Sequence, residues 1–409
     1  MALTYKSSST IHTLESALVD VSAFSISPMG HTVPISGYDA LLKRNYAHAA
    51  FVPDPLPTQL QLSPRTYKLV SEAERELGRL DAAATRLPNP ALLIRPTLMR
   101  EAVSTSALEG TYAPLAAILE ADLEEPSGYT ADVREVLNYV AAARRGIVLI
   151  ETKPICLTVV AELQKLLVQG TRGDLFDAGD LRTSQVYIGE RSAGIEGSRF
   201  VPPPPGDQLR DGISDWEKWI HADDDIPLLI KVALGHYQFE ALHPFSDGNG
   251  RLGRLIVVLQ LIESGALRHP VLNISPWFEP RKEQYKGHLL AVSRDGTMDA
   301  WIQFFSEGLK EQAIDTVRRI DKLIEVRDDM LSQLRATKAK GVVLDIVHDL
   351  IEWPIIDATQ AASLHHVTYP PAAEALRRLE SMGLVQEITG RSYGRRYAAR
   401  RILDALDGR

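Results

Sequence analysis

The residues best suited to chemistry lie together in one segment, HPFSDGNGRLGR, which runs from His243 to Arg254. A histidine titrates near neutral pH and can take a proton from a hydroxyl, so His243 is a candidate general base. Asp247 is a carboxylate of the kind that holds Mg²⁺ beside phosphates. Arg251 and Arg254 are three residues apart, so on a helix they lie on one face and can reach the same phosphate. Together these residue types indicate chemistry on a phosphorylated substrate.

The centre of this segment is a glycine-rich turn, Gly248–Gly250, between two expected helices. The first helix must end near His243, because the proline that follows disfavours helical geometry in the residue before it. The second helix starts at about Gly250, so its first backbone N–H groups form an anion site. Residues 248–253 also read G-x-G-x-x-G, but the preceding element is helical rather than a strand, which excludes a dinucleotide fold. No P-loop sequence occurs in the chain.

The segment resembles the signature of the Fic family, H-P-F-x-[DE]-G-N-G-R-x-x-R, at every specified position. The resemblance implies a helical core in which ATP lies over the turn between the two helices. It also implies that His243 deprotonates a hydroxyl that attacks the α-phosphate of ATP, and that Asp247 holds Mg²⁺. The residues expected to bind the phosphates are Gly248, Asn249, Gly250, Arg251 and Arg254.

The resemblance therefore predicts a protein adenylyltransferase, which moves AMP from ATP to a Ser, Thr or Tyr hydroxyl of a target protein and of itself. Such a transfer depends on positioning and on charge neutralisation more than on covalent chemistry by the protein. The expected cofactors are ATP and Mg²⁺, and the expected partner is a protein that bears the hydroxyl. A homodimer is a further expectation from the family.

A second motif, Thr105 to Gly110 (TSALEG), is similar to the Fic inhibitory motif [ST]-x-x-x-E-[GN] at Thr105, Glu109 and Gly110. The resemblance implies that Glu109 pairs with Arg254 in place of the γ-phosphate, so that the chain restrains itself. Taken without the family, the same residues are typical of a helix end with a capping glycine. In some relatives this glutamate orients a water that removes AMP. A de-AMPylase or a bifunctional enzyme therefore stays open.

Two β-favouring runs, Val186–Ile188 and Arg199–Val201, flank a glycine-rich stretch and predict a short hairpin. This hairpin resembles the Fic flap, which implies that a target segment docks on its edge as an added strand, with Tyr187 and Ile188 as contacts. A hairpin that only packs on the core is the alternative. Further along, Tyr285 lies in a segment that resembles the adenine side of the family's site.

The rest of the chain predicts mostly helices that position these motifs, so the expected fold class is mainly α with one small hairpin. Three domains are expected. Residues 1–95 form an N-terminal helical region, and residues 96–325 form the Fic core with its inhibitory helix at 97–110. Residues 335–409 form a winged-helix domain, because a helix, two short helices broken at Pro370 and a β-hairpin follow one another there.

Five arginines and no acidic residue occupy residues 391–401, so DNA phosphates are candidate partners of the winged helix. Packing or protein binding is the alternative for this domain. A DNA-binding regulator in which the Fic core acts as a sensor is the alternative for the whole chain.

Composition sets wider limits on the chain. It has 409 residues, 45% of them hydrophobic and 24% charged, which is typical of a globular protein of two or three units. The net charge of −8 argues against a general nucleic-acid binder. No segment is apolar enough to span a bilayer, and the N-terminus does not resemble a secretory signal. One cysteine, Cys156, excludes an internal disulfide, and we expect a reducing, cytoplasmic location.

Overall fold

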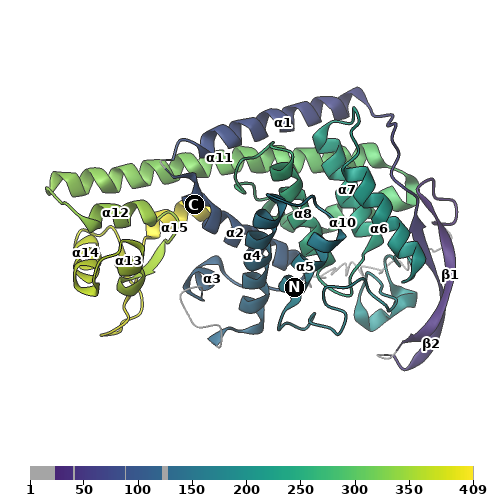
Figure 1. The fold of residues 1–409 in the computed structure, drawn as a ribbon, viewed down its shortest axis with the longest axis horizontal. Coiled ribbons are helices and arrows are strands. Elements are labelled where there is room, and N and C mark those ends of the chain that lie inside the picture. Colours follow the sequence, from purple (N-terminus) through teal and green to yellow (C-terminus); the bar gives the residue numbers. More distant parts are fainter. Residues whose placement is uncertain (1–23, 40–41, 88, 122–127, 409) are drawn as a thin grey trace, which may run out of the picture.

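The computed structural model describes residues 24–39, 42–87, 89–121 and 128–408, and these form an elongated, mainly helical molecule (Figure 1). The larger part of it contains α1 (Pro64–Ala84), α2 (Ile94–Leu108), α3 (Leu115–Ala121), α4 (Ala131–Ile150), α5 (Leu157–Val168), α6 (Asp207–Ile220), α7 (Leu228–Leu242), α8 (Asn249–Glu263), α9 (Ser275–Phe278), α10 (Lys282–Asp295) and α11 (Met298–Ala336). The prediction of a mainly α fold is thereby confirmed. No helix within the described ranges is both long and apolar enough to cross a membrane.

The longest helix, α11, has 39 residues and spans about 58 Å at 1.5 Å per residue. Helix α1 packs along it, as Figure 1 shows. The two helices are joined at their starts, because Asp299 accepts hydrogen bonds from the Ser63 N–H at 2.9 Å and the Thr66 hydroxyl at 2.7 Å. Helix α11 runs without a break past residue 325, where the Fic core was expected to end.

Helices α7 and α8 form the centre of the core and are buried on nearly all sides. Two tryptophans anchor neighbouring helices to α7 through its backbone carbonyls. The indole N–H of Trp216 on α6 donates to Gly235 at 2.9 Å, and that of Trp301 on α11 donates to Ala233 at 2.8 Å. A buried indole that keeps its hydrogen bond avoids the cost of an unpaired donor. The turn between α7 and α8 is therefore held by rigid helices.

The prediction that residues 1–95 are helical is wrong for residues 30–53, which form a β-hairpin. Strands β1 (Gly30–Asp39) and β2 (Arg44–Pro53) pair antiparallel over ten residues each. Side chains of this hairpin pack on Ile195 and Val201, so tertiary contacts decide the conformation. Residues 1–23, which belong to the same expected region, lie outside the described residues.

The expected flap is reduced to one isolated bridge, between Ile188 and Phe200. The Ile188 N–H donates to the Phe200 carbonyl at 2.8 Å, and the Ile188 carbonyl accepts from Arg199 at 2.7 Å. Two short 3₁₀ turns, residues 191–193 and 195–197, interrupt the extended chain. Prolines 202–205 have no N–H groups and end the pairing on the other side. On its outer side Val201 accepts from the Phe51 N–H at 2.8 Å, so β2 lies beside this segment.

The C-terminal unit (residues 342–408) contains α12 (Val342–Asp349), β3 (Ile355–Asp357), α13 (Ala358–Leu364), α14 (Tyr369–Ser381), β4 (Gln386–Glu387), β5 (Arg396–Ala398) and α15 (Arg400–Asp407). Its three strands pair antiparallel in the order β3-β5-β4. The sequence missed β3, which is only three residues long. The break between α13 and α14 falls at residues 365–368 rather than at Pro370, because a proline is tolerated in the first turn of a helix.

Candidate active site

His243 ends α7 in the left-handed conformation, with φ 48°. Its N–H still donates to the Phe239 carbonyl at 3.0 Å, so the residue is attached to the last turn of the helix. Left-handed backbone is costly for a residue with a side chain and persists where the surroundings enforce it. The proline that follows cannot continue the helix. The chain therefore leaves α7 sharply and keeps the imidazole at the turn.

The surroundings of the His243 imidazole favour its neutral form. Its Nδ1 lies 3.3 Å from the carbonyl of Glu240, so an Nδ1–H can donate there and leave Nε2 with a lone pair. Burial and the nearby charge of Arg182 lower the pKa of His243 to about 4. The imidazole is therefore uncharged at neutral pH.

Arg182 holds the turn in place and was missed by the sequence analysis. Only 1% of it is exposed. Its Nε donates to the His243 carbonyl at 2.8 Å, and its Nη2 donates to the carbonyls of Pro203 and Leu242. Its backbone N–H donates to Pro244 at 3.0 Å. Burial lowers its pKa to about 10, so the side chain stays charged. Nothing in the sequence around residue 182 indicates this role.

Asn249 braces the turn with its side chain. Its Oδ1 accepts from the Phe245 N–H at 2.9 Å, and its Nδ2 donates to the Phe245 carbonyl at 2.7 Å. The residue is buried, with 2% exposed. The sequence analysis expected Asn249 to cradle phosphates. The structure shows both polar atoms of its side chain bonded to the backbone of Phe245, and phosphate binding by Asn249 stays a prediction.

The start of α8 is an anion site that already faces a carboxylate. Gly248 precedes the helix with φ 83°, a conformation that favours glycine. A Cβ added at Gly250 would lie 2.2 Å from Oε1 of Glu109, so the carboxylate rests directly against the first turn. Helix N-termini stabilise negative charge through their free N–H groups and the helix dipole. The Glu109 carboxylate thus supplies a negative charge at the start of α8.

Arg254 joins α8 to α2. Its Nη2 donates to Oε1 of Glu109 at 2.6 Å, and its Nε donates to the hydroxyl of Thr105 at 2.7 Å. Burial alone would raise the pKa of Glu109, but the charge and hydrogen bond of Arg254 outweigh it and lower this pKa to about 2. Gly110 follows with φ 92° and ends the helix. The structure therefore brings together the residues of both sequence motifs.

Arg251 is also buried and paired, with 4% of it exposed. Its guanidinium donates to Glu135 at 3.3 Å and to Asp247 at 3.2 Å. The Glu135 carboxylate accepts a second bond from the Thr111 hydroxyl, at 2.7 Å. Glu135 comes from α4 and was missed, because its position in an amphipathic helix does not distinguish it from a surface residue. Arg251 is thus held in place from two sides.

Asp247 fits the requirements of a magnesium ligand. Its side chain is 23% exposed and has close contact with Gly173, where an added Cβ would lie 2.8 Å from the Asp247 Cγ. No cluster of three or more His, Cys, Asp or Glu side chains suited to a metal occurs in the described ranges. Mg²⁺ is commonly held by one or two carboxylates together with substrate phosphates. Asp247 beside an anion site satisfies that pattern.

Tyr285 is placed behind the site. It is 3% exposed, and its hydroxyl lies 2.7 Å from Nε2 of His236 in a cluster of aromatic rings. Burial raises its pKa. Of the flap residues, Tyr187 is half-buried against the β-hairpin, and Ile188 has its backbone bonded to Arg199 and Phe200. Tyr285 is therefore buried, and both flap residues are half-buried.

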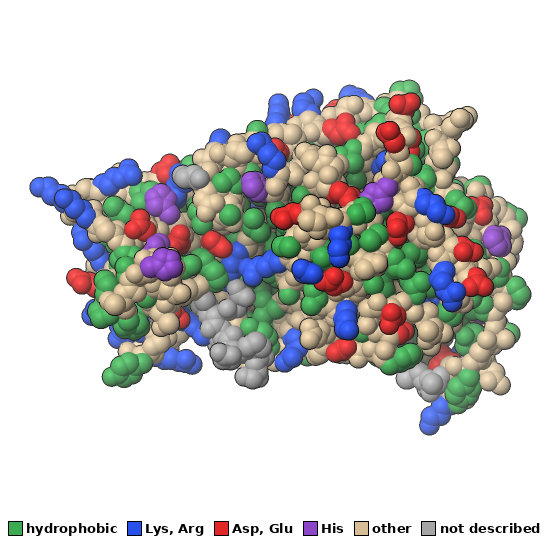
Figure 2. Space-filling model, viewed as in Figure 1, with side chains coloured by type: hydrophobic (Ala, Val, Ile, Leu, Met, Phe, Trp, Pro, Cys, Tyr) green, Lys and Arg blue, Asp and Glu red, His purple; other side chains and the backbone are tan. Residues whose placement is uncertain are grey.

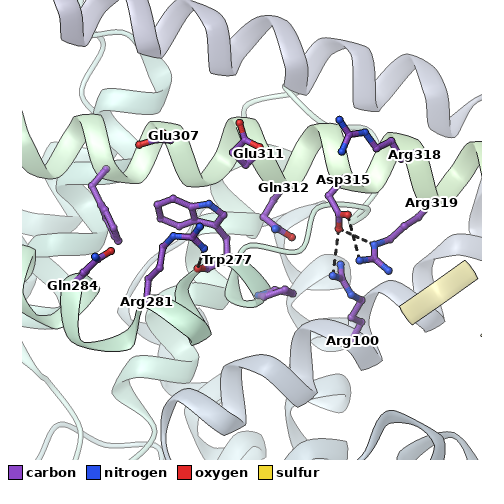
Figure 3. Close-up of a pocket in the computed structure, with 12 residues that line it drawn as sticks. Arg100, Trp277, Arg281, Gln284, Glu307, Glu311, Gln312, Asp315, Arg318 and Arg319 are labelled. Carbon is purple, nitrogen blue, oxygen red and sulfur yellow. Dashed lines mark hydrogen bonds and ion pairs between the residues drawn. The ribbon is translucent and has the colours of Figure 1, made fainter. Parts of the chain in front are cut away.

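A pocket of about 520 Å³ lies elsewhere, between α2, α9 and α11 (Figure 3). In it Asp315 accepts from Arg319 at 2.7 Å and from Arg100 at 3.3 Å. No residue of the 243–254 segment lines it. The two sequence motifs therefore meet outside this pocket.

Comparison with known proteins agrees with this arrangement. Residues 67–148 match the family described as Fic/DOC family N-terminal, and residues 154–261 match the Fic/DOC family. The chain is 28% identical over 221 residues to protein adenylyltransferase fic-1 of Caenorhabditis elegans, covering 50% of this chain and 41% of that protein. It is 30% identical over 137 residues to protein adenylyltransferase Fic of Drosophila yakuba, covering 33% of this chain and 24% of that protein. The chain thus spans less than half of these relatives.

Among solved structures, a Fic family protein from Desulfovibrio desulfuricans G20 is similar, with a TM-score of 0.55 and 19% sequence identity. The similarity covers 84% of this chain and 98% of that chain, and it shows the shared fold. The fold is the mainly helical Fic fold with small antiparallel sheets. These matches assign residues 67–148 and 154–261 to the Fic/DOC family, with distant similarity to the Fic-1 adenylyltransferases.

Proposed function

We propose that this protein transfers AMP from ATP to a protein hydroxyl and that Glu109 restrains the transfer. The observation that carries the proposal is the position of the Glu109 carboxylate, against Gly250 and 2.6 Å from Arg254. An anion site at a helix start, with an arginine beside it, suits a nucleotide phosphate. The distant relatives that match are named protein adenylyltransferases.

His243 would act as the base. With Nδ1 directed at the Glu240 carbonyl, its Nε2 can accept the proton of the target hydroxyl. The hydroxyl oxygen then forms a bond to the α-phosphorus while the bond from that phosphorus to the leaving pyrophosphate oxygen breaks. Arg182 keeps the imidazole in place through the His243 carbonyl. The proton passes to the imidazole, and AMP stays on the target.

The phosphates would lie over the start of α8. The N–H groups of its first turn and the guanidinium of Arg254 would neutralise their charge, while Arg251 stays anchored to Glu135. Asp247 would hold Mg²⁺, which supplies further charge neutralisation on the phosphates when it is bound. In this arrangement the brace between Asn249 and Phe245 keeps the loop in a shape that presents its backbone.

Glu109 would restrain the reaction by competition. Its carboxylate takes the N–H groups and the guanidinium that the terminal phosphate needs, so ATP cannot adopt a productive position while the pair is closed. The pKa of about 2 keeps Glu109 ionised, and so paired, throughout the neutral range. An ionised carboxylate with so low a pKa is a poor proton acceptor, which favours restraint over removal of AMP in this conformation.

Intact mass measurement of the protein incubated with ATP and Mg²⁺ tests the proposal. Glu109→Gly should gain covalent AMP in amounts that exceed the wild type, and the double variant with His243→Ala should gain none. Equal amounts of AMP with and without His243 would reject the assigned base. If AMP is instead removed from a modified protein and never added, the de-AMPylase alternative replaces the transferase.

A segment of the target protein would dock on the flap, residues 186–188, as an added strand. Because the Ile188 backbone is already bonded to Phe200 and Arg199, an added strand would bond the residues on either side of Ile188. The hydroxyl of the target would then be delivered toward His243 by the added strand.

A further inference from the structure

The C-terminal unit presents a helix, α14, with exposed side chains on one face. Helix α14 buries Ala372, Ala375, Leu376 and Leu379 against the unit. On the opposite face Tyr369, Glu374 and Arg377 are exposed. It follows α13 after a turn in which His366 has φ 52°, so the two helices form a helix-turn-helix arrangement. In such pairs the second helix is the one that fits the DNA major groove.

A basic loop projects beside this helix. Residues 388–395 join β4 to β5, and Gly390 and Gly394 take positive φ values of 63° and 62° there. Arg391 and Arg395 are exposed, and Tyr393 is 88% exposed. Within the part of the chain that the structure describes, neither arginine forms an ion pair with a carboxylate. The charge of Arg395 acts on the nearby Glu387 carboxylate, and its Nε donates to the Arg391 carbonyl at 2.9 Å, so both arginines belong to one exposed loop that also presents Tyr393.

Charges near this surface favour an anionic partner. The end of α11 and the connection to α12 add the exposed residues Arg335, Lys338 and Lys340. Figure 2 shows Lys and Arg side chains around the end of the molecule formed by α11 and the C-terminal unit. The acidic residue nearest the loop, Glu387, accepts from the loop's own Thr389 N–H at 2.7 Å and Gly390 N–H at 3.0 Å, so it shapes the loop.

We propose that the C-terminal unit binds duplex DNA, with α14 in the major groove and the 388–395 loop on the adjacent phosphates. The size of one helix matches the major groove, and arginines on a β-hairpin loop are suited to the flanking backbone. The net charge of −8 of the whole chain opposes non-specific binding elsewhere, so binding would depend on this surface. This inference is independent of the AMP transfer.

Fluorescence anisotropy of the full chain with a labelled duplex of mixed sequence tests the proposal. At about 50 mM salt the wild type should bind, and the double variant Arg391→Ala/Arg395→Ala should bind at least tenfold more weakly. Its log–log salt dependence should be shallower by roughly two, one for each lost phosphate contact. The matched control is Arg210→Ala/Lys218→Ala, which removes two exposed cations on α6.

The control should bind like the wild type. Absence of wild-type binding at low salt would overturn the proposal, as would an equal loss in both double variants. A single strand bound as tightly as the duplex would overturn the groove assignment. All four substituted side chains are exposed, so both double variants should melt at the wild-type temperature. An unchanged melting temperature shows that weaker DNA binding comes from a lost contact and not from unfolding.

A different observation carries a second inference, which rests on the proposed role of Glu109. Arg95, in the first turn of α2, is 1% exposed and donates to the Glu352 carbonyl at 2.6 Å. Its guanidinium also lies 3.7 Å from the centre of the Trp353 ring. Both partners belong to the C-terminal unit. The helix that carries Glu109 at one end is therefore clamped at its other end by that unit.

A second connection reaches α2 through the pocket in Figure 3. Arg100 on α2 pairs with Asp315 on α11, and Asp315 pairs with Arg319. Arg319 in turn donates to the Leu406 carbonyl on α15 at 2.6 Å. Charged hydrogen bonds of this kind are among the stronger ones. We infer that the C-terminal unit keeps α2 seated on Arg254, so that moving the unit releases Glu109.

Arg95→Met tests this inference, because methionine keeps an apolar side chain and removes the guanidinium. Hydrogen exchange of α2 amides should become several-fold faster, and covalent AMP should rise several-fold. The matched control is Arg281→Met, which removes the stack of another arginine, 4.4 Å from the Trp277 ring. Trp353→Leu removes the other partner of the stack between Arg95 and Trp353, so it should have the same effects as Arg95→Met.

In the Glu109→Gly background Arg95→Met should add no further AMP, because the restraint is already gone. Unchanged exchange in α2 would overturn the inference, as would an equal rise of AMP in both backgrounds. If no variant ever gains AMP, the proposed function fails, and the exchange measurement alone still decides whether the C-terminal unit holds α2.

Discussion

A buried carboxyl group on α7 makes the stability of the site depend on pH. Glu240 lies beneath the ion pair of Glu109 and Arg254, and an added Cβ at Gly253 would lie 2.8 Å from its Oε1. This oxygen has no hydrogen-bond donor among the described residues. The pKa of Glu240 is raised to about 7, mainly by burial; the charge of Arg254 opposes this rise, and the charge of Glu109 adds to it. The perturbation that removes its charge and keeps its shape is Glu240→Gln.

The magnitude follows from the shift of the pKa. The protonated form is favoured in the folded state, so no cost applies below the ordinary pKa of 4.5, and the cost grows as pH rises toward about 7. One pKa unit corresponds to about 1.4 kcal/mol, so full ionisation costs about 3 kcal/mol. We expect Glu240→Gln to raise the free energy of unfolding by about 3 kcal/mol at pH 8 and by less than about 1 kcal/mol at pH 5.

Urea unfolding of the wild type and the variant at both pH values measures this difference. Glu311→Gln, an exposed carboxylate on α11, is the control and should change stability little at either pH. An equal gain from Glu240→Gln at pH 5 and pH 8 would refute the reasoning, because it would show that shape rather than charge is responsible. No gain at pH 8 would show that Glu240 is already neutral or well solvated there.

Three further outcomes follow from the site. Asn249→Ala removes both hydrogen bonds to Phe245, so unfolding free energy should fall by about 2 kcal/mol, and AMP transfer should be lost. Gly173→Ala should push the Asp247 carboxylate aside and raise the Mg²⁺ concentration needed for half-maximal AMP transfer by Glu109→Gly, with an unchanged Mg²⁺ titration as the contrary result. Because the pKa of His243 is about 4, kcat/KM should stay flat between about pH 8 and pH 6, and a loss centred near pH 6.5 would contradict the assignment.

The sequence was most informative where function depends on neighbouring residues. The segment from His243 to Arg254 indicated a helix end, a turn and a helix start, because proline and glycine act locally on the backbone. The motif around Glu109 indicated a contact with Arg254, 145 positions away, only through the family resemblance. Without the resemblance, the same residues indicated only a helix end with a capping glycine.

Residues that support the site from a distance were not predictable. Arg182, Glu135 and Glu240 act through tertiary contacts, and each is a common charged residue without a spacing signal. Arg182 differs from a surface arginine only because the fold brings several carbonyls to it. The β-hairpin of residues 30–53 was missed for a similar reason, since packing against Ile195 and Val201 lies outside any local window.

Transfer of label from ATP is the most direct test of the central claim. Purified Glu109→Gly protein, which serves as its own target, is incubated with Mg²⁺ and with ATP labelled at either the α- or the γ-phosphate. The account predicts protein-bound label from the α-phosphate alone, which is lost on His243→Ala and is weaker in the wild type. Protein-bound label from the γ-phosphate would contradict it, and so would α-label that is as strong in the wild type as in Glu109→Gly.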